Sequence, residues 1–166
     1  MLAVLTRADT ALAVAVRTRG HNPTTERAAR AFSKTGEHAL LWLALGATGA
    51  LVDRPRRAAW TQATARVALA FAANSAIKLT VRRRRPELDG LPALISTPTQ
   101  LSFPSAHASS SFAAARGFAP LLGGKRYIYP VATAMAATRV YLGVHYPSDI
   151  VAGALLGTLI AGATTS

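Results

Sequence analysis

Three short segments of the chain combine residue types that suit phosphate chemistry. One of them, residues 138–149, places Arg139, His145 and Asp149 at the junction of two apolar stretches, where ionisable groups are either paired or functional. A helix start at Pro147 would bring the Asp149 carboxylate within reach of the His145 imidazole, fixing its tautomer and raising the basicity of its other nitrogen. The pattern predicts a nucleophilic histidine oriented by an aspartate. The alternative is a plain ion pair of Arg139 with Asp149.

The segment Pro104-Ser105-Ala106-His107 lies where a helix should begin. A helix N-terminus presents unpaired N–H groups and partial positive charge, so it can hold phosphate oxygens, and Ser105 can donate a further hydrogen bond. His107 would then be placed as a proton donor. The alternative is a capped helix start with an incidental histidine.

The third segment is cationic. Lys78 and Arg85 are seven residues apart, which predicts one helix face with Arg82 between them and an end of the helix at Pro86. The cluster suits a polyanion, or it is a basic flank that anchors a membrane span. Residues 82–85 are all arginine and could contact nucleic acid, but no aromatic residue is interleaved for base stacking.

Five apolar segments must position these residues. They cover residues 36–52, 58–81, 105–122, 127–144 and 148–163. The first is close to the lower limit of roughly 17 residues for a tilted membrane span. The second carries Arg66, Asn74 and Lys78, so one side of it must face other helices or a polar cavity. We therefore predict an all-α fold, an integral membrane helical bundle of about five spans, in which alternating crossings bring the three segments to one membrane surface.

The N-terminal region, residues 1–35, is different in character. Its first half places Leu5, Ala8, Leu12 and Val16 at spacings of three and four, which predicts an amphipathic helix at the membrane interface or an ordinary surface helix. A turn and a short basic helix should follow. With 166 residues, the chain should form a single domain, with residues 1–35 as an interfacial region and residues 36–166 as the helical core.

The composition joins an apolar body to a basic remainder. Hydrophobic residues make up 51% and the formal net charge is +12, which suits an anionic membrane or nucleic acid, and the apolar segments favour the membrane. The absence of cysteine excludes disulfides, thiol catalysis and Cys-based zinc sites. Arg7 and Asp9 interrupt the first apolar run, so we expect no cleavable signal peptide. Small residues, among them Gly153 and Gly157, predict close helix packing.

Together the motifs Lys78-x6-Arg85-Pro86, Pro104-Ser105-Ala106-His107 and Arg139-x5-His145-x3-Asp149 resemble the three signatures of the type 2 phosphatidic acid phosphatase (lipid phosphate phosphatase) superfamily. Ala106 stands where the family usually has Gly, and Thr138 where Ser is commonest. The resemblance implies a membrane phosphatase with no metal or other cofactor. It implies that His145 becomes a phosphohistidine, that Asp149 orients it and that His107 protonates the leaving oxygen. The implied phosphate-binding residues are Lys78, Arg85, Ser105 and Arg139.

Within that superfamily the short, Ala- and Arg-rich chain is similar to small actinobacterial enzymes that dephosphorylate decaprenylphosphoryl-5-phosphoribose for cell-wall arabinan synthesis. Undecaprenyl diphosphate, phosphatidylglycerol phosphate and phosphatidic acid remain alternative substrates, because the motifs do not choose among head groups. Vanadium haloperoxidases share the motifs but are much larger soluble proteins. The alternative from another class is a non-enzymatic basic membrane protein that binds anionic lipid or nucleic acid.

The expected partners are a lipid-linked phosphate and the cell (plasma) membrane, without nucleic acid; the oligomeric state is left open. Residues 87–103 contain an apolar patch suited to the entry of a lipid tail, or to packing as a loop. Basic residues opposite the site favour an extracytoplasmic active site, whereas those of residues 1–35 favour the reverse. The basic residues opposite the site are Arg54, Arg56, Arg57, Lys125 and Arg126.

Overall fold

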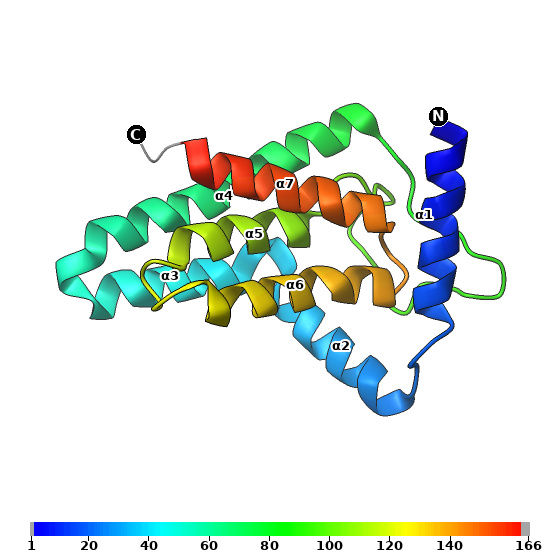
Figure 1. The fold of residues 1–166 in the computed structure, drawn as a ribbon, viewed down its shortest axis with the longest axis horizontal. Coiled ribbons are helices and arrows are strands. Elements are labelled where there is room, and N and C mark those ends of the chain that lie inside the picture. The colour runs from blue at the N-terminus through cyan, green and yellow to red at the C-terminus, as the bar shows by residue number, and fades with distance from the viewer. Residues whose placement is uncertain (1, 164–166) are drawn as a thin grey trace.

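The computed structural model describes residues 2–163, with side chains from residue 7 onward. All the secondary-structure elements of this part of the chain are helices, so the predicted all-α class is confirmed (Figure 1). The helices are α1 (Leu2–Arg17), α2 (Pro23–Thr35), α3 (Leu40–Val52), α4 (Arg57–Val81), α5 (Ala106–Phe118), α6 (Lys125–Tyr141) and α7 (Pro147–Ala163). Short 3₁₀ turns, η1 (Glu37–Ala39) and η2 (Arg54–Arg56), precede α3 and α4.

Helix α5 lies at the centre of the bundle and packs against α4, α6 and α7. Its sequence is mostly Ala and Ser, and these small side chains let the neighbouring helices approach on several sides, so that most of the helix is buried. Helix α1 stands across one end of the bundle, where α4 and α6 end and α5 and α7 begin (Figure 1). All three predicted motifs belong to that end.

The packing of α5 on α7 depends on two glycines of α7. A Cβ atom at Gly153 would lie 2.5 Å from the backbone oxygen of Ser105, and one at Gly157 would lie 2.0 Å from that of Ser109. Both distances are shorter than van der Waals contact, so only glycine fits. The close packing predicted for Gly153 and Gly157 therefore occurs against the first turns of α5, next to the motifs.

The five apolar segments correspond to α3–α7, but the end of α4 differs from the prediction. Arg82 adopts a left-handed conformation (φ 55°), donates its N–H to the Lys78 carbonyl and ends the helix there. Residues 83–85 are then extended, with a β-bridge from Arg84 to Leu101. The prediction that Lys78 and Arg85 share a helix face is therefore wrong. The residue before a proline avoids helical geometry, which suits an extended Arg85.

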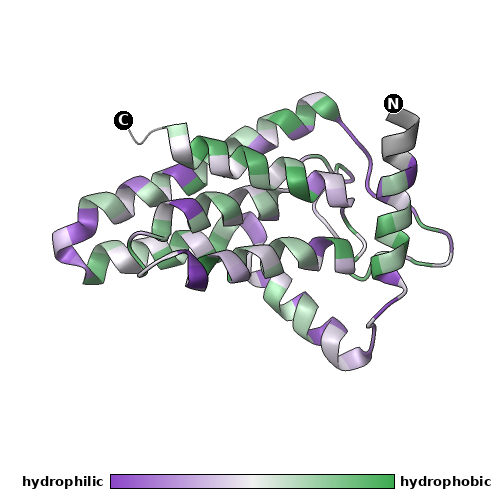
Figure 2. Cartoon of the chain, in the orientation of Figure 1, coloured by the Kyte–Doolittle hydropathy of each residue, from purple (hydrophilic) through white to green (hydrophobic). Residues whose placement is uncertain are grey.

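Apolar and polar residues alternate along most helices (Figure 2). Across residues 2–163, none of the helices has both the length and the apolarity that a membrane crossing requires.

Helix α1 presents its apolar stripe to the outside. Ala8, Leu12 and Val16 are all exposed, Leu12 to 56%, while the fourth member, Leu5, has a side chain outside the described residues. An ordinary surface helix buries such a stripe against the core. This helix buries its other face instead.

The buried face of α1 carries two charges. Asp9, Ala13 and Arg17 follow one another at intervals of four residues and are each at most 6% exposed. They face the end of the bundle, and α1 contacts both α6 and α7 there. The helix is therefore attached to the bundle mainly through polar contacts.

Candidate active site

A cavity of about 190 Å³ at this end of the bundle brings the three motifs together. Five of the seven predicted site residues line it: Lys78, Arg85, His107, Arg139 and His145. Its other walls come from the start of η1, from α4 and from the segment between α4 and α5. Three cations and two imidazoles thus line one cavity.

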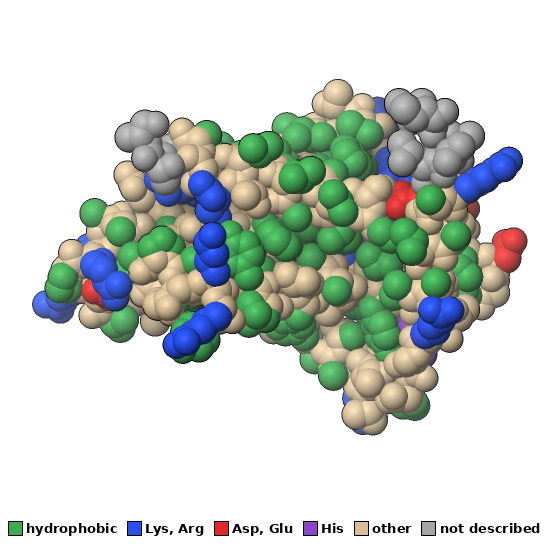
Figure 3. Space-filling view, in the orientation of Figure 1, with side chains coloured by type: hydrophobic (Ala, Val, Ile, Leu, Met, Phe, Trp, Pro, Cys, Tyr) green, Lys and Arg blue, Asp and Glu red, His purple; other side chains and the backbone are tan. Residues whose placement is uncertain are grey.

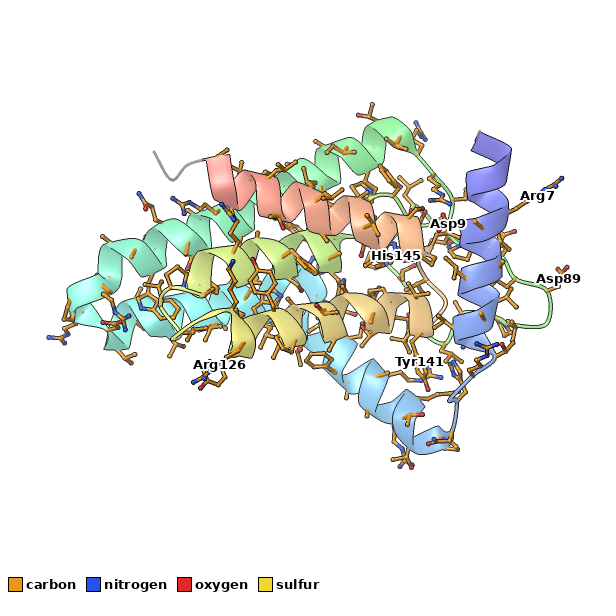
Figure 4. The ribbon with its side chains drawn as sticks, viewed as in Figure 1. Arg7, Asp9, Asp89, Arg126, Tyr141 and His145 are labelled. Atoms are coloured by element: carbon orange, nitrogen blue, oxygen red, sulfur yellow. The ribbon has the colours of Figure 1, made fainter. Side chains whose placement is uncertain are left out.

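His145 lies in the turn between α6 and α7 and is 2% exposed (Figure 4). The turn is possible because Gly143 adopts a positive φ of 76°, and because the Val144 N–H donates to the Arg139 carbonyl at 3.1 Å. The histidine is therefore fixed by a tight backbone reversal rather than by a helix.

The contacts of His145 assign its tautomer. A guanidinium N–H of Arg85 lies 3.2 Å from Nε2 and also donates to the Val144 carbonyl at 2.6 Å. A guanidinium only donates, so Nε2 must accept and the ring proton must be on Nδ1. That nitrogen lies 3.4 Å from Oδ2 of Asp149, an ion-pair distance without the alignment of a hydrogen bond. The lone pair of Nε2 thus faces the guanidinium of Arg85.

Asp149 lies behind His145 and is completely buried. Its Oδ2 accepts the backbone N–H of Tyr146 at 2.9 Å, and its Oδ1 accepts a guanidinium N–H of Arg83, also at 2.9 Å. The alternative of an ion pair between Arg139 and Asp149 is therefore wrong, because Arg83 occupies that place.

Arg139 is held at the end of α6 by α2. One of its terminal nitrogens donates to the hydroxyl of Ser33, while its Nε is buried without any hydrogen-bond partner. Leaving a buried donor unsatisfied costs about 1–3 kcal/mol. An oxyanion in the cavity would supply the missing acceptor, so this orphan N–H is consistent with a phosphate site.

Lys78 and Ser105 hold different positions. The Lys78 ammonium lines the cavity and donates to the Leu101 carbonyl at 3.1 Å. Ser105 lies outside the cavity lining: its hydroxyl caps α5 by accepting from the Ala108 N–H, and its own N–H donates to the Asp149 carbonyl at 3.0 Å. In this structure Ser105 ties α5 to α7 beside the site.

His107 enters the cavity from the first turn of α5. Its Nε2 lies 3.0 Å from the Ser33 carbonyl, which can only accept, so Nε2 carries a proton in either protonation state of the ring. A leaving oxygen would have to replace Ser33 as the acceptor of that proton.

The electrostatic setting keeps His145 neutral. Burial, followed by the charges of Arg85, Arg139 and Lys78, holds its pKa well below the ordinary value of 6.5. Burial also lowers the pKa of Arg85 to about 10, against the opposing effect of Asp149, so this guanidinium stays charged at neutral pH. A neutral imidazole beside fixed cations is suited to attack an anionic phosphorus centre.

The side chains that line the cavity are not a typical set of metal ligands. In the described part of the chain, no group of three His, Cys, Asp or Glu side chains is placed to hold a metal ion. The cavity instead collects cationic side chains, which attract anions and repel metal ions.

Sequence reasoning missed three residues around the site: Asp9, Ser33 and Arg83. The position of Arg83, two residues before Arg85, was a usable signal, since residues i and i+2 of an extended segment face the same side. Asp9 was visible as an acidic residue in a basic N-terminal region. Ser33 gave no signal, because its role depends on how α2 packs.

Comparisons with known proteins find relatives of this chain. Residues 59–166 match the family model described as the PAP2 superfamily. A decaprenylphosphoryl-5-phosphoribose phosphatase of Mycobacterium tuberculosis is 42% identical over 142 residues, which cover 83% of this chain and 77% of that protein. The protein of the same name from Mycolicibacterium smegmatis is 46% identical over 125 residues, covering 75% of this chain and 69% of the relative.

The fold also has a solved counterpart. The crystal structure of a transmembrane PAP2 type phosphatidylglycerolphosphate phosphatase from Bacillus subtilis superposes with a TM-score of 0.75 at 22% identity, covering 95% of this chain and 83% of that one. Taken with the family match over most of the sequence, this shows that the chain belongs to the PAP2 superfamily.

Proposed function

We propose that this PAP2 phosphatase removes the phosphate of decaprenylphosphoryl-5-phosphoribose through a phosphohistidine at His145. The observation that carries the proposal is the buried Nε2 lone pair of His145, which accepts from Arg85 in a cavity that Lys78 and Arg139 also line. Such a site attracts a phosphoryl group and presents a nucleophile to it. The names of the relatives support the substrate.

In the proposed first step, Nε2 of His145 attacks phosphorus and the bond to the ribose 5-oxygen breaks. That oxygen takes the Nε2 proton of His107, which gives up its bond to Ser33. For this transfer His107 enters the step as the imidazolium, having taken up a second proton with the substrate, and it leaves the step as a neutral imidazole. Arg85 turns from Nε2 to the phosphoryl oxygens, and Arg139 gains an acceptor for its unpaired Nε–H.

In the second step, water attacks the phosphohistidine. The P–N bond breaks, inorganic phosphate leaves, and Nε2 recovers its lone pair. His107, deprotonated by the first step, takes the proton of the attacking water. Asp149 remains beside Nδ1 throughout, and its negative charge stabilises the imidazole while it carries the phosphoryl group.

The site has room for more than phosphate. A second cavity of about 480 Å³ shares Arg85 and Ser96 with the first and extends along residues 86–97. Its lining mixes polar side chains such as Glu87 with apolar ones such as Ile95. We assign the ribose and the start of the lipid to this space.

The exposed surface supports a place in the cell membrane. On α7, Val151, Leu155 and Leu159 are spaced four apart and are each at least 59% exposed, and Leu69 and Leu79 of α4 are exposed as well. Figure 3 shows hydrophobic side chains spread over most of one face, with a row of cationic side chains crossing its left part and others at the two ends. A water-soluble protein rarely exposes so many large apolar residues in one region.

We place the active-site end on the extracytoplasmic side. The opposite end carries Arg54, Arg56, Arg57, Lys125 and Arg126, of which Arg126 is labelled in Figure 4. Basic residues gather on the cytoplasmic side of membrane proteins, which supports this orientation.

A phosphate-release panel tests the function. Purified protein in detergent is given decaprenylphosphoryl-5-phosphoribose, undecaprenyl diphosphate, phosphatidylglycerol phosphate and phosphatidic acid, and kcat/KM is compared. The phosphoribose lipid should be the preferred substrate, and His145→Gln should abolish release while leaving lipid binding in place. Lack of phosphate release from every substrate would refute the proposed phosphatase activity. Preference for another lipid would refute the proposed substrate.

A further inference from the structure

Two residues outside the three motifs hold the catalytic pair. We propose, on the basis of the function above, that Asp9 of α1 and Arg83 of the segment after α4 are positioning residues. Arg83 holds the Asp149 carboxylate beside His145, and Asp9 holds Arg83 together with the start of α7. The N-terminal helix is thereby part of the catalytic apparatus.

Arg83 bridges two carboxylates with the two arms of its guanidinium. One terminal nitrogen donates to Oδ1 of Asp149 at 2.9 Å and to the Ser148 hydroxyl at 2.7 Å. The other donates to Oδ2 of Asp9 at 2.7 Å. The guanidinium also lies 4.1 Å from the centre of the Tyr146 ring. A planar fork with this many partners fixes the carboxylates in direction as well as in distance.

The extended backbone explains why Arg83 reaches this place. Side chains of an extended segment alternate in direction, so Arg83 and Arg85 leave it on one side. Both contact the α6–α7 turn: Arg85 at Val144 and His145, Arg83 at Ser148 and Asp149. Arg82 and Arg84 are exposed. Two of the four consecutive arginines therefore contact the turn that carries His145, and the other two are surface residues.

Asp9 completes the arrangement from α1. Its Oδ1 accepts the backbone N–H of Ser148 at 2.9 Å, and its Oδ2 accepts the Ser148 hydroxyl as well as Arg83. Ser148 is the second residue of α7, so this carboxylate satisfies an N–H at the start of that helix, from another helix. Figure 4 shows Asp9 directed toward α7 and Arg7 directed away from the bundle.

Arg17 attaches the same helix to the other side of the turn between α6 and α7. It donates to the Pro92 carbonyl at 2.7 Å and to the Tyr141 carbonyl at 3.4 Å, and it packs against Gly143. With Asp9 near its middle and Arg17 at its C-terminal end, the second half of α1 spans the turn that carries His145. The polar inner face of α1 is explained by this role.

Asp149 needs such support because it is buried. A buried carboxylate without a paired cation is costly, and it reduces that cost by moving or by taking a proton. Either change would release Nδ1 of His145, and a small misplacement of a catalytic group can cost on the order of 100-fold in rate. The loss should appear in kcat, since neither Arg83 nor Asp9 lines the cavity.

The test is a set of variants assayed on the lipid phosphate that the wild type hydrolyses. Arg83→Gln and Asp9→Asn should each lower kcat by roughly 10- to 100-fold with KM within about twofold of wild type. Arg83→Lys should recover part of the loss, because an ammonium can pair with only one carboxylate at a time. In the Arg83→Gln background, Asp9→Asn should cost much less than it does alone.

Matched controls separate positioning from general damage. Arg7→Gln on the exposed side of α1 and Arg84→Gln next to Arg83 should keep wild-type kcat, and all rates are corrected for the folded fraction measured by thermal unfolding. The proposal is overturned if Arg83→Gln and Asp9→Asn keep kcat within twofold, or if their effects multiply in the double variant. An inactive wild type would instead contradict the proposed function.

Discussion

Arg85 donates to Nε2 of His145 at 3.2 Å, so a cation occupies the direction from which the proposed nucleophile would attack. The contact keeps the ring proton on Nδ1, on the side of Asp149, and it keeps the imidazole from binding a proton at Nε2. A phosphoryl group can replace the imidazole as the partner of Arg85. In the proposed mechanism the same side chain both prepares the nucleophile and binds the substrate.

Replacing Arg85 should therefore impair both binding and chemistry. We expect Arg85→Gln to lower kcat/KM by on the order of 100-fold or more, because a transition-state donor and a fixed charge are lost together. Steady-state kinetics on the preferred lipid phosphate measure the effect. Arg84→Gln, one residue away and exposed, serves as the control, and a wild-type kcat/KM for Arg85→Gln would contradict the role.

His145 should remain neutral across the physiological pH range. Its pKa is held below 6.5 by burial and by three cations, and a lowered pKa means that the imidazole stays unprotonated as the pH falls through 6.5. NMR of selectively labelled histidine can follow all four histidines, with His145→Gln assigning the signal. The His145 signal should show no protonation between pH 8 and 6; a midpoint near 6.5 would contradict the assignment.

The same shift has a consequence for stability. The unfolded chain binds a proton at this position near pH 6.5, whereas the native chain does so only at lower pH. His145 therefore costs the protein stability as the pH falls below 6.5. The free energy of unfolding of wild type relative to His145→Gln should decline over that range, and a flat difference would argue against a buried neutral imidazole.

The glycine contact between α5 and α7 should be sensitive to a single methyl group. Gly157→Ala places a Cβ against the Ser109 carbonyl, and overpacking of this kind costs about 1–3 kcal/mol. Thermal unfolding in detergent should show a lower Tm than wild type. Leu155→Ala on the exposed side of α7 is the control, and an unchanged Tm for Gly157→Ala would mean that the helices are less closely packed.

Metal removal should leave the rate unchanged. In the proposed mechanism, Lys78, Arg85 and Arg139 balance the charge that develops on the phosphoryl oxygens, a role that a metal ion has in other phosphatases. Phosphate release is measured after exhaustive treatment with a chelator and again after adding Mg²⁺, Mn²⁺ or Zn²⁺. Loss of activity on chelation with recovery on one of these metals would contradict the prediction.

The helices of the core were predictable because their apolar segments are separated by charged or Pro-containing turns. The end of α4 was not, because a left-handed Arg82 is a local conformation that no periodicity announces. The partner of Asp149 was also out of reach. Any of four consecutive arginines, or Arg139, could have paired with it, and only the extended course of residues 83–85 selects Arg83.

Helix α1 shows the same limit in another form. Its amphipathic spacing was visible, but the direction of the stripe was not, since the pattern is equally consistent with a buried or an exposed apolar face. The contacts of Asp9 and Arg17 on either side of the α6–α7 turn decide which face of α1 is buried. They connect residues more than a hundred positions apart in the sequence, a distance over which one sequence carries no pairing signal.

The most direct test of the central claim is to trap the covalent intermediate. Enzyme is mixed with lipid substrate carrying ³²P in the phosphate to be removed, quenched in alkali, where phosphohistidine survives, and digested for mass spectrometry. One labelled peptide, phosphorylated at His145, should form in wild type and be absent in His145→Gln. In His107→Gln and Asp149→Asn the labelled peptide should be hydrolysed more slowly than in wild type. Rapid phosphate release without any label on His145 would contradict the account.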